Sequence, residues 1–141
     1  MDETISATDY RLSPFGDFLG IEHIASDDTG AVCRMKLSSN HFNAGGRVHG
    51  GALSSLADTA AGLVVRANRP EHSVSATTDL SIAYIRSPLN FCVSAKATLL
   101  HAGKRLHRVE IIIVDDDTTD FVCARLVARA TATFIINKTI D

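Results

Sequence analysis

Two adjoining segments of this 141-residue chain combine residue types that suit acyl-transfer chemistry. The loop Asn43-Ala-Gly-Gly-Arg-Val-His49-Gly50-Gly51 leads into a small, apolar run that contains one acid, Asp58. If a helix begins at Gly50, its first backbone N–H groups lack partners and lie at the positive end of the helix dipole, where they can stabilise an oxyanion. A carboxylate within an apolar helix is partly desolvated, which strengthens it as a base. Attack on a carbonyl needs both groups.

Each feature also has a structural explanation. Gly50 and Gly51 could simply let the chain turn into the helix, and Asp58 could lie on an exposed polar face beside Ser54 and Ser55. Aspartate is a poor residue for a helix interior, so its place among apolar neighbours is the observation that favours a chemical role.

The spacing of the two groups predicts an oligomer. Gly50 and Asp58 are eight residues apart, so one helix separates them by roughly 12 Å. Both must act within about 3 Å of the same carbonyl. We therefore predict a homodimer in which Gly50 of one subunit faces Asp58 of the other across a twofold axis. Pairing of long edge strands favours the same outcome.

The hydrophobic pattern predicts one long helix from Gly50 to about Asn68, with Pro70 just beyond its end. Its small residues allow a sheet to approach closely. The apolar positions at helical spacing are Leu53, Leu56, Ala57, Ala60, Ala61, Val64 and Val65.

The remaining pattern predicts strands. We expect a loose tail over 1–11 and a short helix over 12–19 with Pro14 in its first turn. Alternating segments predict strands at 21–26, 31–37, 74–85, 91–100, 106–114 and 121–136, with a loop over 38–49. Within 74–85, one face is expected to carry Val74, Ala76, Thr78, Leu80, Ile82 and Tyr84.

These elements indicate one α+β domain over residues 1–141. We predict a curved antiparallel sheet of about five to six strands, the last four forming a meander, wrapped around the single long helix.

Composition limits the classes of function. The net charge of −2 and the pI near 6.3 give no electrostatic footprint for nucleic acid. Cys33, Cys92 and Cys123 are odd in number and far apart, which indicates a reducing compartment rather than a disulfide framework or metal site. The acidic N-terminus is unlike a signal peptide, and no run has the length of a membrane span. We therefore expect a cytoplasmic protein that binds neither nucleic acid nor membrane. The five other histidines lack metal-ligand spacing, so no metal is expected.

The order of elements and these residues resemble the hotdog-fold thioesterases, most closely the phenylacetate-pathway (PaaI-like) type. The resemblance covers roughly residues 15–136, and its specific part is Asn43-x5-His49-Gly50-Gly51-x6-Asp58. The segment Ala-Tyr-Ile-Arg-Ser-Pro over 83–88 and the turn Gly103-Lys104 also match. The resemblance implies a hotdog fold, hydrolysis of an acyl-CoA or aryl-acyl-CoA, and a dimer or a dimer of dimers. Coenzyme A is then part of the substrate, and no separate cofactor is expected.

The resemblance also implies roles for individual residues. Asp58 would be the general base toward water or the nucleophile, and the Gly50 N–H would hold the oxyanion. His49 and Asn43 would orient the loop, the thioester or the water, and Thr77 would position the water with Asp58. The structural alternatives are loop capping by Asn43, a local hydrogen bond from His49 and β-propensity at Thr77.

Some cations are expected near the phosphates of coenzyme A. The segments that resemble the coenzyme-binding ones contain Arg86, Pro88, Gly103, Lys104 and Arg105. Solvated surface charge is the alternative explanation for each of these cations.

Two other functions stay open. A hotdog dehydratase or hydratase generally needs a paired histidine and acid, whereas this helix carries the acid alone. A non-catalytic acyl-CoA-binding module has no use for a desolvated base. A Gly-x-Ser-x-Gly elbow of a serine hydrolase is absent from the sequence. Phe15, Phe18, Leu19 and Phe42 suggest an apolar acyl group.

Overall fold

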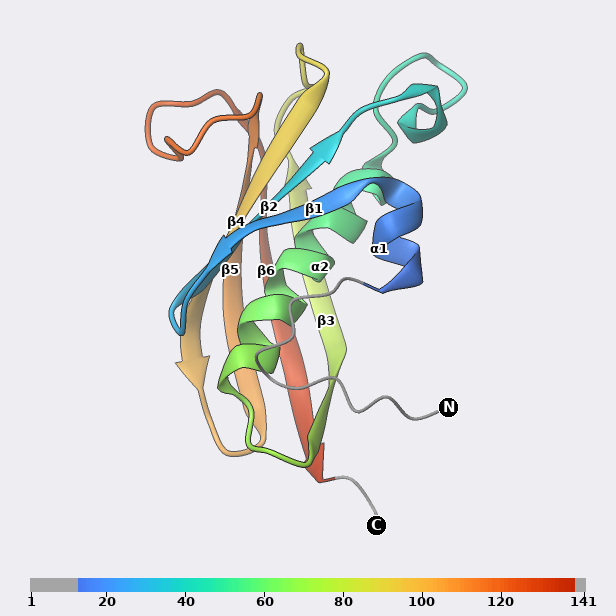
Figure 1. The fold of residues 1–141 in the computed structure, drawn as a ribbon. Coiled ribbons are helices and arrows are strands. Elements are labelled where there is room, and N and C mark those ends of the chain that lie inside the picture. Colours follow the sequence, from blue (N-terminus) through green and yellow to red (C-terminus); the bar gives the residue numbers. More distant parts are fainter. Residues whose placement is uncertain (1–12, 139–141) are drawn as a thin grey trace.

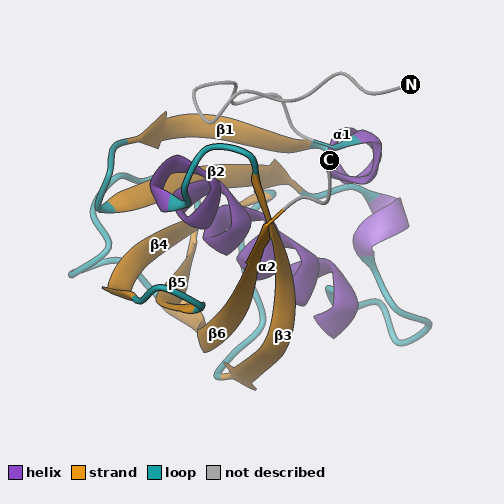
Figure 2. Ribbon diagram, turned by 90° about the horizontal axis from the view of Figure 1, so that it is seen from below, coloured by secondary structure: helices purple, strands orange, loops and turns teal. Residues whose placement is uncertain are grey.

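The computed structural model describes residues 13–138, and in it a curved antiparallel sheet wraps around one long helix (Figures 1 and 2). The predicted α+β architecture is confirmed, and the tail predicted over 1–11 lies outside the described residues. The elements are α1 (Pro14–Leu19), β1 (Ile21–Ser26), β2 (Gly30–Lys36), the 3₁₀ turn η1 (Ser39–His41), α2 (Gly50–Asn68), β3 (Ser73–Tyr84), β4 (Cys92–Ala102), β5 (Leu106–Asp115) and β6 (Leu126–Lys138).

The sheet is not the four-stranded meander that the sequence predicted. Its order is β1-β2-β4-β5-β6-β3, so β3 pairs with β6 at one edge while β4 pairs with β2. Of the four strands that follow α2, only β4, β5 and β6 pair in chain order. Strand β3, which follows α2, pairs with β6 at the edge of the sheet. The connection after β3 then crosses the sheet and brings β4 beside β2. This order places β3 alongside α2 at an edge.

A β-bulge in β3 changes which side chains share a face of the strand, so the face predicted from simple alternation is wrong. Thr77 pairs with Phe134 and Asp79 pairs with Thr133, which leaves Thr78 as an extra residue. An extra residue reverses the alternation of inward and outward side chains. Val74, which is 43% exposed, therefore does not share a face with Leu80. The side chains of Ser75 and Thr77 lie on the inward face instead.

The strand predicted over 121–136 begins five residues later, at Leu126. The Asp120 carboxylate accepts hydrogen bonds from the backbone N–H groups of Val122 and Cys123, both at 3.0 Å. These two N–H groups are therefore not available to pair with a neighbouring strand, although the residue types of this segment resemble those of a strand.

The loop predicted over 38–49 contains η1, which fixes the approach to α2. His41 is buried; its Nδ1 accepts from the Ser38 N–H at 2.9 Å, and its Nε2 donates to the Leu19 carbonyl at 2.6 Å. The imidazole therefore joins the end of α1 to the segment that leads into α2.

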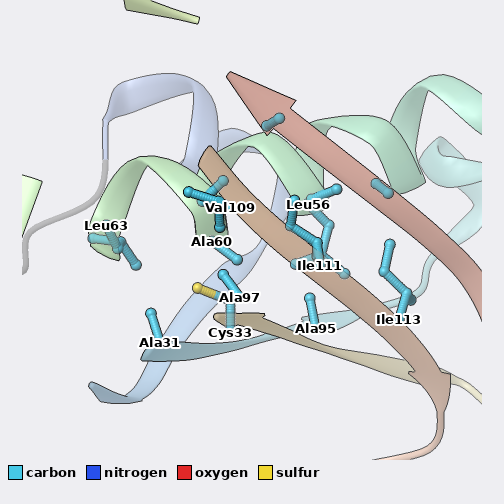
Figure 3. Packing of buried hydrophobic residues seen from close by; sticks show 14 of the residues in the cluster. Ala31, Cys33, Leu56, Ala60, Leu63, Ala95, Ala97, Val109, Ile111 and Ile113 are labelled. Atoms are coloured by element: carbon cyan, nitrogen blue, oxygen red, sulfur yellow. The ribbon is translucent and has the colours of Figure 1, made fainter. Parts of the chain in front are cut away.

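Helix α2 begins and ends where the sequence predicted, and one of its faces forms the centre of the core (Figure 3). Leu56, Ala57, Ala60 and Ala61 are fully buried, and Leu56 packs toward the apolar side chains of β5. The alanines allow the helix backbone to approach the sheet closely, as the composition of the helix indicated. Within residues 13–138, no helix has the length and apolar character needed to cross a membrane.

Replacing Leu56 by Ala should destabilise the fold strongly. The side chain is 0% exposed, so its loss leaves a cavity that costs about 2–5 kcal/mol of unfolding free energy. Urea unfolding followed by circular dichroism measures this change.

The matched control is Leu100→Ala, because Leu100 is 55% exposed at the end of β4. Its effect should stay within about 1 kcal/mol. Equal losses in the two variants would contradict the placement of α2 at the centre of the core.

Candidate active site

Asp58 and Thr77 lie together in a groove between α2 and β3. Thr77 Oγ1 donates a hydrogen bond to Asp58 Oδ1 at 2.7 Å. The bulge after Thr77 aims its hydroxyl toward the helix, and such bulges commonly re-aim a side chain beside a functional site. The sequence paired these two residues, and the structure brings them into contact.

The Asp58–Thr77 pair borders a cavity of about 340 Å³. The Asp58 side chain is half-buried, so the chain does not provide the fuller desolvation that the apolar helix suggested. The lining residues are Ser13, Asp58, Thr59, Gly62, Leu63, Arg66, Arg69, Ser75, Thr77 and Phe134.

Gly50 lies at a second cavity, of about 350 Å³, at the start of α2. The Tyr84 hydroxyl donates to the Gly50 carbonyl oxygen at 2.9 Å. A Cβ at position 50 would lie 3.1 Å from the Tyr84 ring, so a larger residue fits only if that ring shifts slightly. Among residues 13–138, the Gly50 N–H donates to no protein group and remains available to a ligand. The lining residues are Val48, Gly50, Leu53, Tyr84, Ile85, Arg86, Ser87 and Pro88.

His49 and Asn43 make the structural contacts that the sequence allowed. His49 is the N-cap of α2, and its Nδ1 accepts from the Gly51 N–H at 2.7 Å. A Cβ at Gly51 would lie 2.9 Å from that nitrogen, so the cap depends on the glycine. Asn43 Oδ1 accepts from the N–H groups of Gly45 and Arg47 and so closes the loop. Neither residue lines the two cavities.

The residues expected to contact coenzyme A fall into two groups. Arg86 and Pro88 line the Gly50 cavity. Gly103, Lys104 and Arg105 form the β4–β5 turn and line neither cavity; the Arg105 carbonyl accepts from the Ile136 N–H, and Ile136 pairs with Ser75. The turn is therefore at the end of the sheet where β3 begins. Phe15, Phe18 and Phe42 are exposed, and neither they nor Leu19 border either of these two cavities in the single chain.

A single chain does not unite Asp58 with Gly50. The two residues border different cavities along α2, on either side of the turns of helix between them. This separation agrees with the distance that the spacing predicted, so each cavity contains one of the two groups but not the other.

Sequence reasoning missed Asp115, which supports the segment that carries Arg86 and Pro88. Asp115 is 3% exposed and accepts from the N–H groups of Leu89 and Asn90 at 2.7 and 3.2 Å. Arg125 Nε lies 3.5 Å from its Oδ2. Asp115 is the first of three consecutive aspartates, and nothing in the sequence distinguished its carboxylate from the two that follow.

Tyr84, Arg66 and Arg69 were also missed as site residues. Tyr84 lay within the matching 83–88 segment, but no chemistry pointed to its hydroxyl. Arg66 lies near the end of α2, and Arg69 is the C-cap residue that follows the helix. The pKa of Arg69 is lowered, first by burial and then by the nearby charge of Arg66.

The three cysteine thiols differ in burial. Burial raises the pKa of the Cys33 thiol to about 12, whereas Cys123 is exposed. Within the described part of the chain, no three His, Cys, Asp or Glu side chains gather as metal ligands would.

The chain is similar to several known proteins. It is 33% identical over 111 residues to the Halobacterium salinarum protein VNG_1336C, which carries the provisional name of an esterase; the match covers 73% of this chain and 72% of that protein. Conserved protein PA5202 of Pseudomonas aeruginosa shares 30% identity with a TM-score of 0.79, over 92% of this chain and 98% of that one. The thioesterase HI1161 of Haemophilus influenzae, at 20% identity and a TM-score of 0.80 over 90% and 85% of the two chains, shares the fold.

A family model described as the Thioesterase superfamily matches residues 45–122, which contain Gly50, Asp58 and Thr77. The six-stranded sheet around a central helix is the hotdog fold of the structural neighbours. By family match, sequence identity and fold, the chain belongs to the Thioesterase superfamily.

Proposed function

We propose that the protein is an acyl-CoA thioesterase of the PaaI-like type that acts as a homodimer. The observation that carries the proposal is the Asp58 carboxylate, held at 2.7 Å by Thr77 Oγ1 at the border of a cavity in a chain of the Thioesterase superfamily. Hydrolysis of a thioester in this family needs a base or nucleophile at the carbonyl and a donor for the oxyanion.

The hydrogen bond from Thr77 leaves the second carboxylate oxygen of Asp58 for chemistry. As general base, Asp58 takes a proton from water while the water oxygen bonds to the thioester carbon. The Gly50 N–H donates to the oxyanion that forms, at the positive end of α2. The carbon–sulfur bond then breaks, and the thiolate of coenzyme A takes the proton from Asp58. As nucleophile, Asp58 would instead bond to the acyl carbon and expel the thiolate of coenzyme A, and water would then hydrolyse the mixed anhydride to the free acid and the Asp58 carboxylate.

The dimer is part of the proposal because the two cavities are incomplete separately. An antiparallel pair of α2 helices across a twofold axis brings Gly50 of one subunit to Asp58 of its partner, and makes two identical sites. Pairing of two copies of β3, an edge strand, would extend both sheets. A dimer of dimers is compatible with this arrangement.

Further features support the finer assignments. Arg86 and Pro88 border the Gly50 cavity, where the guanidinium can meet a phosphate of coenzyme A. His49 and Asn43 fix the loop that precedes the oxyanion donor. The free cysteines Cys33, Cys92 and Cys123 suit the reducing cytoplasm.

Asp58→Asn should lower kcat for acyl-CoA hydrolysis by about 10²–10⁴-fold, because the amide cannot accept the proton. Turnover is best followed by the loss of thioester ultraviolet absorbance, since the exposed Cys123 thiol reacts with the disulfide reagents that detect coenzyme A.

The asparagine is similar in shape and retains the oxygen that Thr77 contacts, so circular dichroism should be unchanged. Wild-type turnover in this variant would remove Asp58 from the mechanism. Hydration of an enoyl-CoA, or tight binding of acyl-CoA by the wild type without hydrolysis, would favour the two alternative functions.

Gly50→Pro should abolish most activity because proline removes the donor N–H. Proline is accepted at the first position of a helix, and the extended His49, with φ −66° and ψ 131°, is compatible with a following proline. We expect a kcat about 10²–10³-fold lower than that of Gly50→Ala.

Gly50→Ala is the matched control, since its Cβ meets the same Tyr84 ring but the N–H remains. Steady-state kinetics of both variants separate the lost donor from the steric effect. Similar kcat values in the two would argue against the Gly50 N–H as oxyanion donor.

A heterodimer of an Asp58→Asn subunit with a Gly50→Pro subunit should recover about half of the wild-type activity, because one of its two sites is intact. The two subunits can carry different affinity tags and be isolated together. A site formed within one chain would give no recovery, since every site would then contain one defect.

A further inference from the structure

The cavity beside Asp58 contains two cations in addition to the reactive pair. Arg66 lies on α2 about two turns after Asp58, and Arg69 is the C-cap residue that follows the helix. Both arginines line the cavity. Arg69 Nη1 donates to Ser75 Oγ at 3.0 Å rather than to the carboxylate of Asp58. The cavity therefore has a carboxylate at one end and cationic groups at the other.

The cationic end lies close to the reactive end. Ser75 and Thr77 are alternate residues on the inward face of β3, so their side chains are about 7 Å apart. Thr77 holds Asp58, and Ser75 accepts from Arg69. A thioester carbonyl at Asp58 leaves space for only a few carbon atoms before the Arg69 guanidinium.

Part of the wall between these two ends is apolar, although Thr59 also lines the cavity. Phe134 and Leu63 line the cavity, and Gly62 leaves open space beside them. Within 4 Å, a Cβ at Gly62 would meet only Phe134 Cε1, at 4.0 Å. A short methylene chain suits this middle section better than a polar group does.

A bound anion would compensate the partly buried charge of Arg69. Burial and the nearby charge of Arg66 both lower the pKa of Arg69, so its guanidinium is less well hydrated than in open water. A guanidinium binds a carboxylate or phosphate through a planar pair of donors. The chemistry of this end is therefore that of an oxyanion-binding subsite.

We propose that this cavity binds the acyl group of the substrate, and that this group is short and ends in a carboxylate that Arg69 binds with Arg66 beside it. The inference rests on the proposed thioesterase function. The phosphates of coenzyme A are the other anions in such a substrate, but the pantetheine arm holds them much farther from the thioester than the about 7 Å between Ser75 and Thr77. The short distance therefore favours a carboxylate of the acyl group.

Glutaryl-CoA and valeryl-CoA test the proposal, because their acyl chains have the same number of carbons and only glutaryl ends in a carboxylate. We expect the wild type to have a kcat/KM at least about 10-fold higher for glutaryl-CoA, and Arg69→Gln to lose at least about 10-fold on that substrate alone. Thioester absorbance measures both reactions.

Arg108→Gln is the matched control. Arg108 Nη1 also donates to a strand hydroxyl, that of Thr133 at 2.9 Å, but Arg108 is exposed on β5 outside the cavity. Its kcat/KM values should equal those of the wild type on both substrates, which separates a local role from a general loss of positive charge.

The outcomes distinguish the possible failures. An equal loss on both substrates in Arg69→Gln would assign the cation to a phosphate of coenzyme A and overturn the inference. Unchanged kinetics in Arg69→Gln would overturn it too, while leaving the thioesterase function intact. Hydrolysis of neither these thioesters nor aryl-acyl-CoA would overturn both proposals.

Discussion

The close packing of α2 on the sheet determines where every other group of the site can lie. Ala57, Ala60 and Ala61 are fully buried, and side chains this small bring the helix backbone near the strands. With that face committed to the core, the stripe that contains Asp58 faces the groove beside β3. The position of the carboxylate is thus a consequence of helix packing, and only its immediate partner, Thr77, comes from elsewhere in the chain.

The sequence predicted best what depends on local periodicity. Both ends of α2 follow from the glycines after His49, the apolar spacing and Pro70. Asp58 was identifiable because a lone acid is unexpected in that run. Strand pairing is a non-local choice, so the partners of β3 were predicted wrongly. The segment 121–125 was mistaken for strand because residue types do not reveal that Asp120 captures its N–H groups.

The side-chain environment of the site was harder to predict than its residues. Thr77 was named from the resemblance, but simple alternation assigned Thr78, and not Thr77, to the face shared with Leu80. The buried state of Asp115 depends on two backbone donors from a distant segment. Arg69 lines the cavity beside Asp58 where β3 places Ser75 opposite it. Each depends on how two elements meet, which a single sequence does not specify.

The bulge in β3 allows this edge strand to lose one residue without losing the contact to Asp58. Thr78 is the residue that the ladder does not need, since Thr77 and Asp79 pair with adjacent residues of β6. A deletion of Thr78 would restore a regular ladder in which Thr77 still faces Phe134 and Asp79 still faces Thr133. The Thr77 hydroxyl would therefore keep its inward position beside the carboxylate on α2. During divergence, a single-codon loss at this point could pass without separating the two side chains.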